Sequence, residues 1–245
     1  MIGSVAVGVI LPESNGSGEN WTGTEQTQVA AEIQAGLARW SDWSDNTTPD
    51  TNLDHVTANV SFTYDFQYSI PTTVEPIQGS SNVCPWISEV LGNMGFTNPD
   101  GCWERVYDYL DDLRSSQGTD WATIIFVVDS SADFDGTFTD GYFGFAYING
   151  PFIMMTYDND GWGIGNMDMV TQHEMGHIFG AGDNYYAAGY GGCTSTTEPY
   201  GYLSIPNSNC EYNNPGADIY VLMNNNTIDR IHWTSQYQAG WKDSD

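Results

Sequence analysis

The sequence predicts one α/β (α+β) domain built on a twisted, mixed sheet of five strands. With 245 residues, 40% hydrophobic and 14% aromatic, the chain is long and apolar enough for one packed core. Strand-like and helix-like patterns alternate along its first two thirds. Two short runs that are almost wholly apolar, residues 3–11 and 122–128, are typical of strands covered on both faces.

The first part of the predicted sheet precedes a helical crossover. Residues 3–11 form the first strand, and a polar loop follows at 12–23. Val29, Ile33 and Leu37 recur at helical spacing, which predicts a helix over 24–41. Clean alternation of apolar and polar residues predicts a long strand over 56–70. Two helices are expected next, over 84–94 and 102–116.

The second part of the sheet leads into the segment that carries the chemistry. Residues 122–128 are expected to form a central parallel strand, 142–148 an aromatic edge strand and 152–157 a fifth strand. Asn149-Gly150 between the last two predicts a tight turn. Beyond residue 183 the sequence is loop-like, and a C-terminal helix is expected over 228–241. We therefore expect subdomains at 1–182 and 183–245 within one domain.

The charge of the chain excludes several kinds of partner. Thirty-two acidic residues face five basic ones, a formal net charge of −27. Nucleic acids and anionic membrane surfaces are disfavoured, because both need clustered Lys and Arg. No apolar run approaches the roughly 20 residues that span a bilayer. Such acidity suits either plain solubility or a saline environment, and the sequence does not choose between them.

Four cysteines allow three disulfide pairings. We expect the sequence-local pairs Cys84–Cys102 and Cys193–Cys210, which close two modest loops. None of the cysteines has C-x-x-C spacing, so a cysteine metal site or redox motif is not expected. An even count with a single lysine indicates a secreted protein. Residues 5–11 lack a basic flank and resemble a strand more than a signal peptide, so we expect a mature or trimmed form.

The residues with the clearest chemistry lie between 167 and 183. His173 and His177 are four residues apart, which places both imidazoles on one helix face, where they can hold one metal ion. Glu174 points slightly away from that axis and can reach a water on the metal. Gly180 can end the helix and turn the chain back. Asp183, six residues after His177, can then supply a third ligand.

This stretch resembles the metzincin zinc peptidases, whose long motif is H-E-x-x-H-x-x-G-x-x-H. Here Asp183 takes the last position, and H-E-x-x-H-x-x-G-x-x-D is similar to the snapalysin-type branch. The resemblance implies a zincin-like fold with a long active-site helix and a zinc-dependent endopeptidase. Met223 would be the methionine of the turn beneath the zinc. The edge strand, with Gly144, Phe145, Ala146 and Tyr147, would pair with an extended polypeptide substrate.

The implied chemistry is peptide hydrolysis by Glu174-assisted attack of a zinc-bound water. Tyr185, Tyr186 and Tyr190 are candidates for stabilising the oxyanion or for lining the cleft. The acidic loops 129–140 and 158–168 could also hold a structural calcium ion, because oxygen ligands spaced by two around a glycine suit it. We expect a monomer that binds neither nucleic acid nor membranes.

Two alternatives stay open on the sequence. A gluzincin-type peptidase would take its third ligand from a downstream glutamate, and Glu198 and Glu211 are available. A non-catalytic, metal-stabilised extracellular binding or adhesion module would also fit the aromatic content. An intact Glu174 argues against the second alternative, since a purely structural metal site has no use for it.

Overall fold

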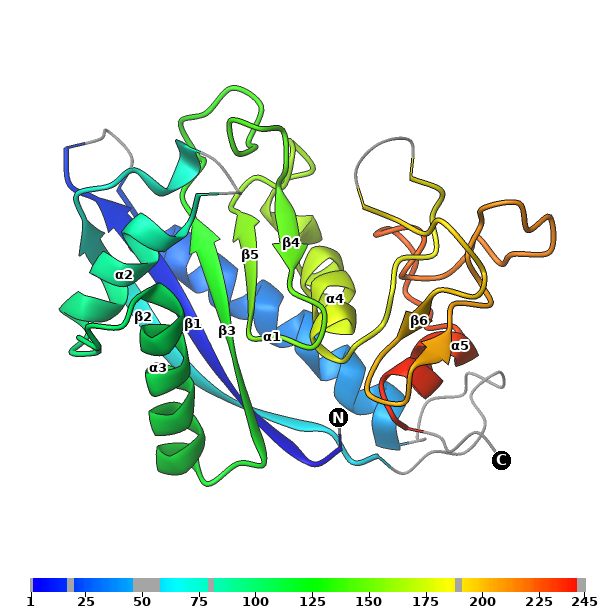
Figure 1. Ribbon diagram of the computed structural model, residues 1–245. Helices are drawn as coiled ribbons and strands as arrows, with labels where there is room; N and C mark the ends of the chain where they lie inside the picture. Colours follow the sequence, from blue (N-terminus) through cyan, green and yellow to red (C-terminus); the bar gives the residue numbers. More distant parts are fainter. Residues whose placement is uncertain (1, 17–19, 46–57, 79–81, 188–190, 242–245) are drawn as a thin grey trace.

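The sheet has five strands, of which four are parallel. A computed structural model describes residues 2–16, 20–45, 58–78, 82–187 and 191–241. The strands are β1 (Ser4–Ser14), β2 (Ser61–Thr72), β3 (Trp121–Val128), β4 (Gly144–Ala146) and β5 (Phe152–Thr156). They lie in the order β2-β1-β3-β5-β4 (Figure 1). Only β4 runs antiparallel to its neighbour, so the expected mixed sheet is confirmed.

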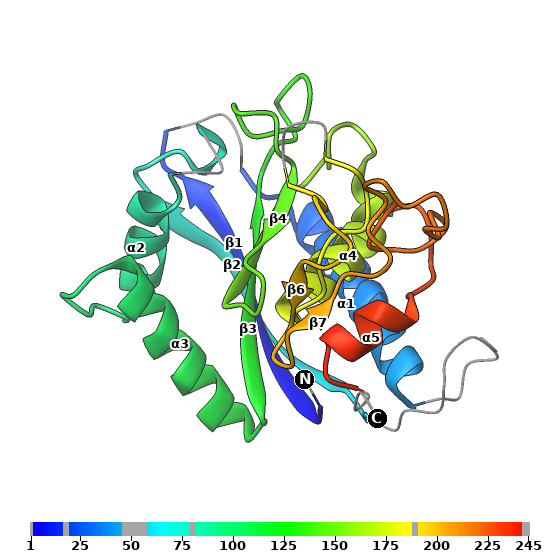
Figure 2. The ribbon, with the colours of Figure 1, turned by 45° about the vertical axis from the view of Figure 1, so that its right-hand side comes forward.

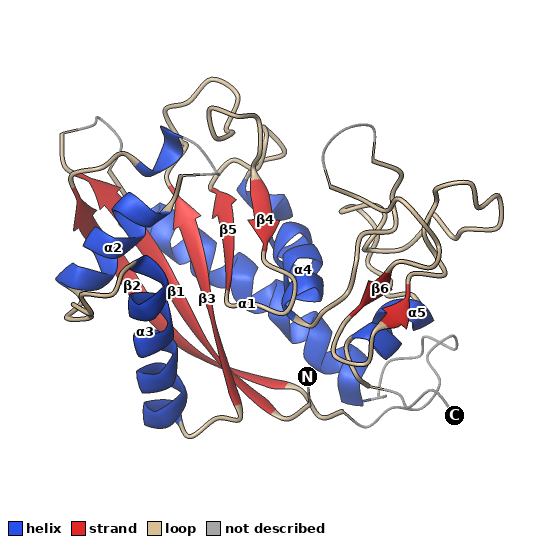
Figure 3. Ribbon diagram, viewed as in Figure 1, coloured by secondary structure: helices blue, strands red, loops and turns tan. Residues whose placement is uncertain are grey.

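Helices cover both faces of the sheet (Figure 3). One face packs against α1 (Gly23–Asp45) and α4 (Met167–Ile178), and the other against α2 (Cys84–Asn93) and α3 (Cys102–Gln117). In β1, Val5, Val7 and Val9 face the first layer, whereas Ala6 and Ile10 face the second. The apolar runs of the sequence are therefore central strands buried on both sides, as predicted.

Several predicted boundaries were wrong for reasons that the pairing explains. β1 continues to Ser14, because its parallel pairing with β2 resumes past an irregularity between Ile10 and Pro12. β2 begins at Ser61, and the predicted start at residues 56–57 lies outside the described residues. β4 has three residues instead of seven, since the turn at Asn149 and Gly150, both with positive φ, closes it early. The turn itself was correctly predicted.

The C-terminal segment is mostly irregular and lies beside α4 (Figure 2). It contains a two-stranded ribbon, β6 (Pro199–Tyr200) and β7 (Ile205–Pro206), and the short helix α5 (Trp233–Gln238). The predicted longer helix over 228–241 was wrong. The Leu222 amide donates to the Arg230 carbonyl and the Arg230 side chain binds the Tyr220 carbonyl, so the chain before α5 is held out of a helix.

Two disulfides join the expected pairs, Cys84–Cys102 and Cys193–Cys210. The first joins the starts of α2 and α3, and the second lies in the C-terminal segment. Disulfides of this kind are typical of an oxidising environment.

Within the described residues, no helix has both the length and the apolar character needed to cross a membrane. The division of the chain into subdomains at residue 183 stays a prediction.

Candidate metal centre

The helix α4 is held in place by α1, independently of any metal ion. The Trp40 indole of α1 donates to the Gln172 carbonyl over 2.9 Å. Asp168 lies in the first turn, where a carboxylate suits the positive end of the helix dipole. All residues from Val170 to Ile178 are buried, so the side chains of this helix can be reached only through the cleft that His173, Glu174 and His177 line.

Both histidines of α4 are oriented by backbone carbonyls. His173 Nδ1 lies 3.0 Å from the Leu222 carbonyl oxygen, and His177 Nδ1 lies 2.9 Å from that of Ala181. A carbonyl only accepts, so each Nδ1 donates its proton to the carbonyl that it faces. Each Nε2 faces the Asp183 carboxylate, where a metal ion could take the place of a proton on that nitrogen.

Asp183 completes a group of three ligands. Gly180, with φ of 91°, turns the chain at the end of α4, as the sequence predicted. One Asp183 carboxylate oxygen, Oδ1, then lies 3.0 Å from His173 Nε2 and 3.3 Å from His177 Nε2. Among the described residues, this is the one group of three or more His, Cys, Asp or Glu side chains whose ligand atoms lie within 4.8 Å of one another.

The electrostatics of the three side chains favour a cation between them. Burial disfavours a charged His177, but Asp183 and Glu174 outweigh it and raise the pKa of His177 to about 9. Burial likewise opposes the charge of Asp183, yet the two histidines hold its pKa far below the usual range. A divalent cation would replace the proton on His177 and satisfy the same carboxylate.

Glu174 lies beside this group and has an unpaired oxygen. The side chain is 5% exposed, and its Oε2 has no hydrogen-bond partner within the described part of the chain. Burial raises the pKa of Glu174, and the two neighbouring histidines offset part of that rise. A Cβ at Gly144 of β4 would lie 3.4 Å from Glu174 Oε1, so the missing side chain of Gly144 leaves this carboxylate open to the cleft.

A cleft of about 530 Å³ runs over the three ligands. One wall is β4 with the preceding aromatic residues, and the other is formed by Tyr185, Gly191 and the run Asn224 to Asn226. Gly144, Phe145 and Ala146 line the cleft, and their pairing with a substrate stays a prediction. Tyr147 does not line it, because its ring packs against Trp103 and Phe152 on the other face of the sheet.

The structure separates the three candidate tyrosines. Tyr185 lines the cleft with Asp183, and burial followed by the charges of Asp183 and Glu174 raises the pKa of Tyr185. Tyr186 is 54% exposed and stacks on Tyr212, away from the cleft. Tyr190 lies outside the described residues.

The other predicted residues have clear positions. Met223 lies under α4, since a Cβ at Gly176 would approach its sulfur to 2.5 Å. Glu198 and Glu211 were the third ligands expected for a gluzincin-type site. Glu198 accepts from the Thr194 hydroxyl and Glu211 from the Tyr186 amide, and neither belongs to the group of His173, His177 and Asp183.

Sequence reasoning missed two parts of the site. Residues Asn224 to Asn226 line the cleft, and sequence reasoning assigned them no functional role. Their place directly after Met223 was the available clue. The carbonyls of Leu222 and Ala181 that orient the histidines have no side-chain signature, so no pattern could reveal them.

Comparison with known proteins finds one distant structural similarity. No protein-family model matches the chain, and no curated protein matches it. Among solved structures, the chain is similar to a zinc-dependent peptidase from Methanocorpusculum labreanum, with 15% sequence identity and a TM-score of 0.38. The alignment covers 95% of this chain and 99% of that one. At this similarity the neighbour identifies neither the fold family nor the activity of this chain.

Proposed function

We propose that the protein is a zinc-dependent endopeptidase of the metzincin type, with His173, His177 and Asp183 as metal ligands. The observation that supports it is the convergence of two imidazole nitrogens and a carboxylate oxygen beside Glu174 in an open cleft. Two imidazoles and one carboxylate suit Zn²⁺ and leave one position open for chemistry.

Zinc bound there would act as a Lewis acid on the scissile carbonyl and on the attacking water. Glu174 would take the proton from that water and deliver it to the leaving amine. Its buried position suits this task, because a raised pKa lets a carboxylate both accept and return a proton near neutral pH. Tyr185, which lines the cleft with Asp183, would lie beside the reacting carbonyl.

The free edge of β4 supports an extended polypeptide as the substrate. β4 pairs with β5 on one side only, so its other backbone edge can bond a peptide strand. With Glu174 and Asp183 in the cleft and a net charge of −27, we expect neutral or basic peptides to be preferred over acidic ones. We further propose that the protein acts as a secreted monomer.

Elemental analysis together with casein hydrolysis tests the proposal. The wild type should hold one zinc per chain and hydrolyse casein. Glu174→Gln should keep the zinc and lose roughly 10²–10⁴-fold in rate, the usual contribution of a general base. Glu198→Gln is the matched control and should change neither. Zinc without hydrolysis in the wild type would favour a binding module, and loss of zinc in the control would favour the gluzincin-type site.

We also propose a structural calcium ion between the loops after β3 and β5. Asp129 is 7% exposed, and its Oδ2 and that of Asp133 are buried without a partner in the described residues. Burial raises the pKa of Asp133 and of Asp158, and the charge of Asp129 adds to the rise in both. Such acceptor-only oxygens suit Ca²⁺, although the loops would have to close around it. Calcium should raise the Tm of the wild type but not of Asp129→Asn, at constant ionic strength.

A further inference from the structure

The third metal ligand lies in a loop without regular structure, so other parts of the chain must hold it. Residues 181–185 follow α4 and belong to no helix or strand. The direction of the Asp183 carboxylate depends on the orientation of the backbone that carries it. A metal site loses affinity when its ligands are poorly oriented, and the groups that orient them matter almost as much as the ligands themselves.

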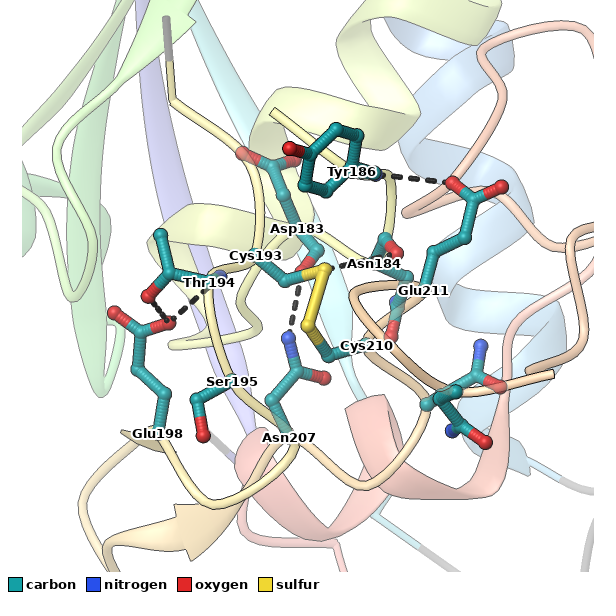
Figure 4. The surroundings of a disulfide bond; sticks show 12 residues. Asp183, Asn184, Tyr186, Cys193, Thr194, Ser195, Glu198, Asn207, Cys210 and Glu211 are labelled. Carbon is teal, nitrogen blue, oxygen red and sulfur yellow. Dashed lines mark hydrogen bonds between the residues drawn. A yellow bond between two sulfur atoms is a disulfide. The ribbon is translucent and has the colours of Figure 1, made fainter. Parts of the chain in front are cut away.

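The residues of the Cys193–Cys210 disulfide region bond this loop at three successive positions. Figure 4 shows the first of these bonds, from Asn207 to Asp183. The Asn207 side-chain amide donates to the Asp183 carbonyl over 2.6 Å. The Glu211 amide donates to the Asn184 carbonyl over 2.8 Å, and the Cys193 amide donates to the Tyr185 carbonyl over 2.9 Å. Of these bonds, the one from Asn207 is made to the ligand residue itself.

The buried amide of Asn207 is not explained by a gain in folding stability. The side chain is fully buried, and its Oδ1 has no partner within the described part of the chain. An unpaired buried carbonyl costs free energy that an apolar side chain would avoid. The Asn207 side-chain NH₂ group offsets part of this free-energy cost through its bond to the Asp183 carbonyl.

The disulfide holds Asn207 at this place. The Cys210 amide donates to the Asn207 carbonyl over 2.9 Å, and both cysteines are fully buried. The segment from Cys193 to Cys210 contains only the two-residue strands β6 and β7, so the disulfide closes a loop that has little other regular structure.

We propose that Asn207 is a positioning residue for the third metal ligand, and that the Cys193–Cys210 disulfide keeps it there. This inference rests on the proposed metal site and extends it to a part of the chain that touches no metal. Metal affinity is thereby coupled to one disulfide and not to the other.

Zinc affinity and thermal unfolding of the metal-free protein, measured side by side, test the assignment. Asn207→Leu and the isosteric Asn207→Asp should raise the zinc Kd roughly 10- to 100-fold, as is typical for groups that orient ligands. Asn209→Leu is the matched control. Asn209 is 3% exposed in the same loop, but both ends of its amide bond the backbone of Asp218. This control should lower the Tm and leave the zinc Kd within about twofold.

The two disulfides provide a second, independent comparison. They span 17 and 18 residues, so their removal should affect the unfolded chain about equally. Replacing Cys193 and Cys210 by alanine should weaken zinc binding as Asn207→Leu does, with little further loss when the changes are combined. Replacing Cys84 and Cys102 should lower the Tm without changing the zinc Kd.

The results distinguish this inference from the proposed function. If the wild type binds zinc and hydrolyses casein while the Asn207 variants bind zinc normally, only the role of Asn207 is rejected. Equal losses in the Asn207 and Asn209 variants, or for both disulfides, would also reject it, since they would show a general effect of stability. A wild type that binds no zinc would reject the proposed function, and this inference with it.

Discussion

Adding one methyl group to α4 at Gly176 should disturb the packing under the metal site. A Cβ built there would lie 2.5 Å from the Met223 sulfur and 3.2 Å from its Cε. Ordinary contacts between such atoms are about 3.5–4.0 Å, so the overlap is on the order of 1 Å. Met223 is 1% exposed, so its side chain is enclosed by its neighbours. In Gly176→Ala, one of the two side chains must therefore move.

The expected free energies follow from this overlap. Overpacking costs about 1–3 kcal/mol, and Ala gains about 1 kcal/mol over Gly in a helix. Gly176→Ala should therefore destabilise the protein by up to about 2 kcal/mol. Met223→Ala alone should cost about 2–5 kcal/mol through the cavity it leaves. In the double variant the new methyl enters that cavity, so the double variant should be about 1–3 kcal/mol more stable than the sum of the single changes predicts.

Urea unfolding of the metal-free protein measures this double-mutant cycle. Gly165→Ala is the control, because a Cβ there would meet nothing within 4 Å. It should leave stability nearly unchanged. Additivity of Gly176→Ala and Met223→Ala within about 0.5 kcal/mol would refute the contact. It would also remove the evidence that Met223 supports the helix carrying both histidines.

Three further predictions concern charge and pH. Burial lowers the pKa of His232, the N-cap of α5, to about 4. The contribution of His232 to folding stability should therefore be complete above pH 6.5 and fall as the pH drops from there toward 4. In pH-dependent unfolding curves, His232→Asn should flatten that slope, because Asn keeps a cap but does not titrate. With a net charge of −27, the Tm should rise with NaCl as repulsion is screened, and a Tm that is equal in 0.05 M and 1 M salt would contradict this. If the endopeptidase proposal holds, Asp183→His removes one negative charge at the metal, so the acidic limb of the pH–rate profile should move to lower pH; an unshifted limb would argue against Asp183 as a ligand.

Strong periodicity made the sheet and its covering helices predictable. β1 and β3 are apolar on both faces because helices cover both, and that requirement is visible in the sequence alone. The edge strand predicted over 142–148 was too long, since Phe143 and Tyr147 flank β4 and their rings pack against Trp162 and Trp103. β-propensity at an edge cannot separate these two causes.

The three side chains of the candidate metal centre could be predicted from the sequence, whereas the residues that hold them could not. The spacing of His173, His177 and Asp183 is imposed by one helix and one turn, so it is local and appears in the sequence as a fixed pattern. The bond from Asn207 to Asp183 joins residues 24 apart through an irregular loop. No periodicity links them, and the correctly predicted Cys193–Cys210 pair does not reveal which residue of that loop bonds Asp183. Local geometry therefore indicated the candidate ligands, whereas the groups that hold them became visible only in the folded chain.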